Sequence, residues 1–178
     1  GYYIYGWRHV PVNVSCLGEK ANATRPEIEQ LLVSNSKGVD EETFERELYV
    51  IRRRIEKAAQ AAGIHGLYLA SLSCRSIIYK GMFLAEDMSE FYPDLKDERF
   101  ESAFALYHQR YSTNTFPQWW LAQPFRMLAH NGEINTLKGN KNWMKSHEIR
   151  MSSDAFGDMA DDIKPVIPSG SSDSAALD

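Results

Sequence analysis

The sequence predicts an α+β domain with a mainly antiparallel sheet, and two observations lead to this prediction. Apolar runs typical of strands and segments with helical spacing come in blocks, without the regular alternation of strand and helix that a parallel sheet requires. The chain has 178 residues, 43% of them hydrophobic and 25% charged, which fits one globular domain with a sizeable core.

The charge and the cysteine content narrow the classes of partner. The formal net charge of -4 argues against a general nucleic-acid binder, because phosphate contacts require a surplus of Lys and Arg. No apolar run approaches the ~20 residues that span a bilayer, so we expect no membrane partner. Cys16 and Cys74 are too few for a disulfide framework and lack the spacing of a zinc site. We expect no metal site and a cytoplasmic location, or a plastid for a plant or algal source.

The first half of the chain predicts an extended segment, a strand and a long helix. Residues 7–14 alternate around Pro11, which cannot donate to a sheet, so we expect an edge segment. Residues 28–33 predict a strand. From Asp40 apolar residues recur every three or four positions, which predicts a helix with Asp40 as N-cap and Gly63 as its stop.

Arginines 52–54 on this helix lie within helical reach of acidic residues. They could form a phosphate-binding patch, but we expect a solvated, ion-paired face instead. Cys16 could be a nucleophile, but we expect a small buried residue, because no basic group lies near it in sequence to lower its pKa.

The second half predicts several short strands and a central loop. Residues 67–72 and 76–79 predict a hairpin or two neighbouring strands, and residues 81–90 return to a helical pattern. Residues 104–107 and 125–129 predict two strands that flank a polar and aromatic loop. The loop contains Phe116, Trp119 and Trp120, which could stack nucleic-acid bases but fit a packed loop wall better.

A second helical pattern follows Asn131 and Gly132, at the end of the last predicted strand. A glycine turn between a strand and a helix leaves backbone N–H groups pointing outward, as in anion sites and oxyanion holes. The Asn131 amide and the Gly132 N–H could stabilise the oxygen of a tetrahedral intermediate. The alternative is a tight turn, since Asn-Gly is also the strongest hairpin dipeptide.

Three further residues could recognise a small zwitterion. Arg110 has a planar fork suited to a carboxylate, with Thr113 just beyond it, although a surface ion pair is the alternative. Asp173, in a loop of small residues at 169–174, could bind an ammonium group, although such aspartates are usually turn formers. No Ser-His-Asp order, Cys-His pair or metal cluster supplies a nucleophile in this stretch.

Several motifs carry a resemblance to a known family. They are GWRHVPVN from Gly6, YKGM from Tyr79, FYPDL from Phe91, HQRYSTNTFPQWWLAQPFRMLAHNGEINTLKGNKNWM from His108, and SDSAALD at the end. Together they closely resemble the class II glutamine amidotransferase domain of glutamate synthase large subunits. The resemblance implies the fold of N-terminal-nucleophile (Ntn) hydrolases, a four-layer αββα sandwich with mainly antiparallel sheets.

The resemblance also implies a role for each candidate residue. An N-terminal cysteine would attack the side-chain amide of L-glutamine, with its own α-amino group as the base. Arg110 would hold the α-carboxylate, Thr113 would line the pocket, Asn131 and Gly132 would form the oxyanion hole, and Asp173 would bind the α-amine. This chain begins with Gly1 instead. We therefore expect residues 1–178 to be an incomplete domain that lacks its nucleophile segment and is inactive alone.

The resemblance further implies an enzyme that passes ammonia from glutamine to 2-oxoglutarate. Its FMN, its iron–sulfur cluster and its NAD(P)H or ferredoxin donor would be bound elsewhere in the enzyme. We expect this segment to bind no cofactor. Its partners would be the remaining domains of the parent chain and a small electron-transfer subunit. Two alternatives stay open: a non-catalytic glutamine-binding or regulatory module, and a structural interaction domain with an aromatic surface.

Overall fold

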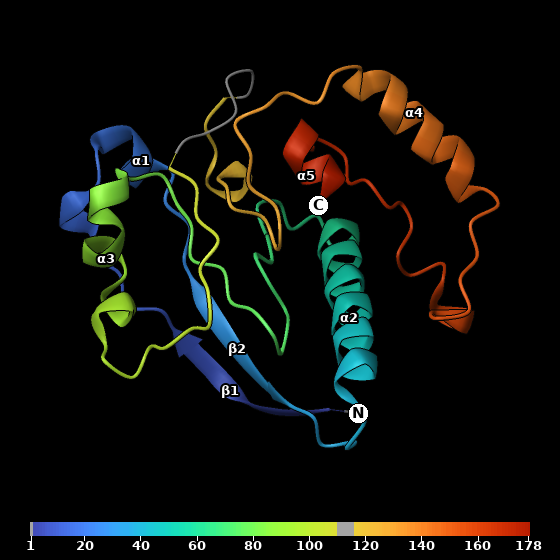
Figure 1. The fold of residues 1–178 in the computed structure, drawn as a ribbon, viewed down its shortest axis with the longest axis horizontal. Helices are drawn as coiled ribbons and strands as arrows, with labels where there is room; N and C mark the ends of the chain where they lie inside the picture. Colours follow the sequence, from blue (N-terminus) through green and yellow to red (C-terminus); the bar gives the residue numbers. More distant parts are fainter. Residues whose placement is uncertain (1, 110–115) are drawn as a thin grey trace. The chain divides into compact units, whose positions relative to one another are not determined.

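The computed structural model describes residues 2–109 and 116–178. The chain divides into two compact units, and each unit combines two stretches that are far apart in the sequence (Figure 1). Unit 1 consists of Gly1–Val39 and Tyr79–Pro124, and unit 2 consists of Asp40–Ile78 and Phe125–Asp178.

The sheet of unit 1 is a two-stranded antiparallel pair, and it is the only sheet within the described part of the chain. Strand β1 (Tyr3–His9) pairs with β2 (Glu29–Ser34), and Trp7 lies opposite Leu31. The predicted strand at 28–33 is therefore confirmed to within one residue. The predicted edge segment was placed too late in the chain, because β1 ends at His9, two residues before Pro11.

Short helices complete unit 1. The prediction of a helix at 81–90 is only partly confirmed, because helical structure begins at residue 85. The helices of unit 1 are η1 (Val14–Cys16), α1 (Glu19–Ala23), η2 (Ala85–Asp87), α3 (Met88–Phe91), η3 (Pro93–Lys96) and η4 (Trp119–Leu121).

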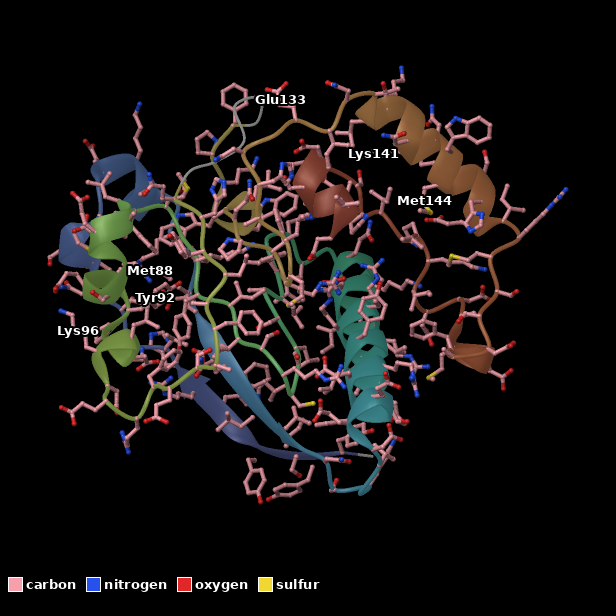
Figure 2. The ribbon with its side chains drawn as sticks, viewed as in Figure 1. Met88, Tyr92, Lys96, Glu133, Lys141 and Met144 are labelled. Carbon is pink, nitrogen blue, oxygen red and sulfur yellow. The ribbon has the colours of Figure 1, made fainter. Side chains whose placement is uncertain are left out.

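An aromatic cluster forms the core of unit 1. Phe91 is fully buried, and its ring lies 5.0 Å from that of Phe83 and 5.6 Å from that of Trp119. Tyr92, between α3 and η3 (Figure 2), is also buried and donates its hydroxyl to the Lys80 carbonyl at 2.7 Å. A Cβ at Gly81 would lie about 2.5 Å from atoms of Phe83 and Trp119, so this close packing requires glycine there.

A charged network joins the sheet of unit 1 to η3. The Arg8 guanidinium donates to both carboxylate oxygens of Asp94, at 2.7 and 2.6 Å, and the Tyr79 hydroxyl donates to Asp94 at 3.1 Å. The hydrogen bond from Arg8, assisted by that from Tyr79, holds the pKa of Asp94 below its usual value. Asp94 is thus ionised at neutral pH.

The aromatic loop is packed in part. Trp119 is buried and donates its indole N–H to the Ala21 carbonyl at 3.2 Å, which confirms the packed wall for this residue. Phe116 is 89% exposed, so the same prediction is wrong for it.

Unit 2 is built on one long helix. Helix α2 (Glu41–Ala61) begins after Asp40, whose carboxylate accepts the Thr43 N–H at 2.9 Å, and Gly63 follows its end with a φ of +70°. The predicted helix, N-cap and stop are therefore confirmed. The other helices of unit 2 are α4 (Leu137–Glu148), η5 (Gly157–Met159) and α5 (Asp173–Leu177).

The arginines of α2 correct one expectation. Arg53 is 5% exposed and donates to Glu56 and to the Pro165 carbonyl, each at 2.6 Å, while Arg54 pairs with Asp162 at 2.5 Å. Ion pairing is confirmed, but the solvated face is wrong for Arg53. Helical spacing identified the acid at position 56 but not the distant segment that covers this side of α2.

Four predicted strands are absent from the described residues. Segments 67–72, 76–79, 104–107 and 125–129 make no ladder with a neighbouring strand. Their composition suits a half-buried pleated surface, but a strand also needs a partner, which composition does not supply. The α+β class is thus confirmed with a smaller sheet than predicted.

None of the helices in residues 2–109 and 116–178 is both long and apolar enough to cross a membrane.

Candidate functional site

Two of the five predicted site residues lie outside the described part of the chain. These are Arg110 and Thr113. Asn131, Gly132 and Asp173 are all described and all belong to unit 2. The structure therefore shows where Asp173 lies relative to the Asn131-Gly132 turn.

Asp173 is the first residue of α5, and its carboxylate reaches the segment after the Asn131-Gly132 turn. Its Oδ2 accepts the N–H of Ile134 at 2.9 Å, and its Oδ1 accepts the N–H of Ser174 at 2.7 Å. The bond from Ile134 spans 39 residues of sequence and brings the two predicted features together. The Ser174 hydroxyl also lies 3.3 Å from Oδ1. Since an ionised carboxylate has about four acceptor sites, these three donors still leave capacity for a ligand.

The same bonds keep Asp173 charged. Burial alone would raise the pKa of Asp173, but the hydrogen bonds from the backbone N–H groups of Ile134 and Ser174 outweigh it. The pKa of this carboxylate therefore lies below its usual value, and Asp173 is an anion at neutral pH. A partly buried anion with free acceptor sites is suited to an ammonium group.

The Asn131-Gly132 turn is not a hairpin. It joins residues 125–130 to α4, and neither neighbour is a paired strand, so it does not close a hairpin, while the alternative of a tight turn without a catalytic role stays open. Both residues are exposed, and a Cβ at Gly132 would meet only the Nδ1 of His130, at an ordinary 3.6 Å. Asn131 and Gly132 thus lie at the surface of unit 2.

A second hydrogen bond joins the segment around the turn to α5. The Nε2 of His130, directly before Asn131, lies 2.8 Å from the Oγ of Ser174, which is 1% exposed. From α4, Lys141 (Figure 2) donates to the Ser171 carbonyl at 2.7 Å. Nothing in the sequence predicted the contact between His130 and Ser174, because a pair 44 residues apart leaves no periodic pattern.

Comparison with known proteins decides the family. The sequence pattern of the family described as "Glutamine amidotransferases class-II" matches residues 1–178. The chain belongs to the class II glutamine amidotransferases. The resemblance drawn from the motifs is thereby confirmed.

The relatives of this amidotransferase chain are glutamate synthases. It is 71% identical to the glutamate synthase [NADPH] large chain of Azospirillum brasilense and 48% identical to the chloroplastic ferredoxin-dependent glutamate synthase of Oryza sativa subsp. japonica, with all of the chain aligned in both cases. It is 45% identical to the glutamate synthase [NADH] of Saccharomyces cerevisiae over 98% of the chain. It spans 12%, 11% and 8% of the length of these relatives.

Neither cysteine of this amidotransferase chain is an activated nucleophile. Burial raises the pKa of the Cys16 thiol, and the charge of Asp87 adds to the effect. Loss of water around Cys74, together with the neighbouring Glu45 carboxylate, raises the pKa of Cys74 to about 11. Both are therefore free thiols that stay protonated at neutral pH. Cys16 is only half-buried, but the expectation that it is not a nucleophile agrees with its pKa.

The Cys74 thiol should gain reactivity when Glu45 loses its charge. In a Cys16→Ser background, Glu45→Gln is expected to speed alkylation by iodoacetamide at pH 8 about five- to tenfold, because the neutral amide no longer disfavours the thiolate. The rate is followed by intact-protein mass spectrometry. Glu42→Gln, an equal change at an exposed position of the same helix turn, is the control and should leave the rate unchanged. Equal rates for the two variants would contradict the prediction.

Proposed function

We propose that this chain is part of the glutamine amidotransferase domain of a glutamate synthase large chain. In this proposal the complete domain hydrolyses L-glutamine to glutamate and ammonia, and the ammonia is transferred to 2-oxoglutarate elsewhere in the enzyme. The observation that supports it most is the position of Asp173, whose ionised carboxylate is bonded to Ile134 beside the Asn131-Gly132 turn. In this proposal the carboxylate that binds the α-ammonium group of glutamine lies beside the turn whose donors bind its side-chain carbonyl oxygen.

Each residue takes one role in this proposal. Asp173 binds the α-ammonium group of glutamine, while the Asn131 side-chain amide and the Gly132 N–H donate hydrogen bonds to the amide oxygen and stabilise the negative charge that develops on it. Arg110 holds the α-carboxylate and Thr113 lines the pocket. These last two assignments rest on the family resemblance alone.

The attacking group in this proposal is an N-terminal cysteine, as the family resemblance implies. As its sulfur adds to the amide carbon of glutamine, the thiol proton passes to the α-amino group of the cysteine, and the amide oxygen carries the negative charge. The C–N bond then breaks while the α-amino group returns that proton to the leaving nitrogen, which departs as ammonia. Water then hydrolyses the thioester to glutamate. Cys16 and Cys74 are internal residues with raised pKa values, so we propose that residues 1–178 alone bind glutamine without turning it over.

The surrounding enzyme is also part of the proposal. We propose that residues 1–178 contribute to a four-layer αββα sandwich completed by other segments of the parent chain. An iron–sulfur cluster takes four cysteines, and this chain has two, so its residues do not fit one. FMN, the cluster and the NAD(P)H or ferredoxin donor belong in this proposal to other domains or to a small electron-transfer subunit. Two free thiols suit a reducing compartment, the cytoplasm or a plastid.

Asp173→Asn tests the proposed amine site. In the full-length enzyme this change is expected to raise KM for glutamine about 10- to 100-fold, because a charge-assisted hydrogen bond to the substrate ammonium is lost. For the glutamine analogue that lacks the α-amino group, the same change should leave KM within about threefold. The measurement is initial-rate kinetics of ammonia release with both substrates.

The two substrates separate recognition from disruption. Asn at 173 also loses one of the two backbone hydrogen bonds, and a purely structural defect would affect both substrates equally. An equal loss with both would remove the amine role from Asp173. A full-length enzyme that binds glutamine but releases no ammonia would instead favour the non-catalytic binding module.

A further inference from the structure

The turn and α5 are joined by two hydrogen bonds that bracket the proposed site. On one side, His130 Nε2 lies 2.8 Å from Ser174 Oγ, and on the other the Ile134 N–H donates to Asp173 Oδ2 at 2.9 Å. Positions 130 and 134 are thus tied to consecutive residues of α5. Asn131 lies between these two anchors, so their lengths determine where the turn lies relative to the carboxylate.

The bond between Ser174 and His130 is shielded from water. Ser174 is 1% exposed, and its hydroxyl also lies 3.3 Å from Asp173 Oδ1. In such a place water cannot replace a lost partner, so the bond constrains geometry more than a surface hydrogen bond does. Ser174 therefore contacts both halves of the proposed site, the carboxylate through Asp173 and the turn through His130.

We infer that Ser174 and His130 form a positioning pair that fixes the distance between the Asp173 carboxylate and the Asn131-Gly132 turn. This inference rests on the proposed function. If the carboxylate holds the α-ammonium and the turn receives the side-chain carbonyl oxygen, their separation selects an amino acid with the chain length of glutamine. A displacement of about 1 Å at a reacting centre can lower the rate about 100-fold, so a partial loss of this restraint has a measurable effect.

A double-mutant cycle in the full-length enzyme tests the pair. Ser174→Ala and His130→Ala are each expected to lower kcat/KM for glutamine about tenfold and to raise KM, and the double variant should lose about tenfold rather than about 100-fold. His130→Gln, whose amide can occupy the position of Nε2, should stay within about threefold of the unsubstituted enzyme. A purely structural defect reduces the amount of active enzyme and lowers kcat without changing KM.

Ser171→Ala is the matched control. Ser171 is a buried serine of the same loop, and its hydroxyl donates to the Pro168 carbonyl at 2.6 Å rather than to the turn. It should lose stability but keep its KM for glutamine.

The outcomes distinguish this inference from the proposed function. A double variant that loses about 100-fold, or single variants with an unchanged KM, would overturn the positioning pair. If the unsubstituted enzyme still released ammonia, the proposed function would stand. No ammonia release by the unsubstituted enzyme would overturn both.

Discussion

Replacing Phe91 with alanine is expected to destabilise the protein by about 3–5 kcal/mol. Phe91 is fully buried, and its ring contacts those of Phe83, Tyr92 and Trp119, so truncation leaves a cavity in the middle of the unit 1 core. The loss combines the transfer free energy of the phenyl group with the contacts that the surrounding rings no longer make. Urea denaturation followed by tryptophan fluorescence measures the change, because Trp119 belongs to the cluster.

Phe116 offers a matched control for this experiment. It is the same residue type in the same unit, but it is 89% exposed, so Phe116→Ala should change the free energy of unfolding by less than about 0.5 kcal/mol. Similar losses for the two alanine variants would mean that Phe91 is not at the centre of the core.

Asn131→Ala is expected to lower kcat for glutamine about 10²- to 10³-fold in the full-length enzyme, with little change in KM. In the proposed mechanism the side-chain amide of Asn131 stabilises charge that appears only as the tetrahedral intermediate forms. A donor of this kind contributes to the transition state and not to the bound substrate. Steady-state kinetics of ammonia release separates kcat from KM and gives the result directly.

The control for Asn131 is another exposed asparagine of unit 2. Asn142 lies on α4, and Asn142→Ala removes the same amide while leaving the turn intact. It should keep kcat within about twofold. A loss at Asn131 that falls on KM alone would contradict an oxyanion role, since it would mean that the amide holds the substrate equally in both states.

Local signals predicted the helical part of the fold better than the sheet. Asp40, Gly63 and the apolar spacing between them are all short-range, and they predicted α2 almost to the residue. A strand depends on a partner that can lie anywhere in the chain, which is why residues 104–107 look like a strand in sequence and are unpaired in the structure. Arg53 was misjudged for a related reason, since the Pro165 carbonyl that it binds is 112 residues away.

The same difference between short-range and long-range signals applies to the candidate site. Residue chemistry alone suggested that Asp173 and the Asn131-Gly132 turn belong together, and the bond from Ile134 to Asp173 brings them to adjacent positions. The same reasoning could not identify Ser174. One serine among six in residues 169–174 and 152–153 has no distinguishing pattern, and only the folded chain shows which hydroxyl meets His130.

The two-unit organisation affects how the chain is synthesised. Residues 40–78 interrupt unit 1, and residues 79–124 interrupt unit 2, so neither unit corresponds to one continuous stretch of messenger RNA. Helix α2 leaves the ribosome more than 100 residues before Pro165, which Arg53 binds. At ~5–20 residues per second this delay is on the order of 5–20 seconds. For that time Arg53 lacks the carbonyl group that it binds in the folded chain, so this side of α2 is completed only after residue 165 has been made.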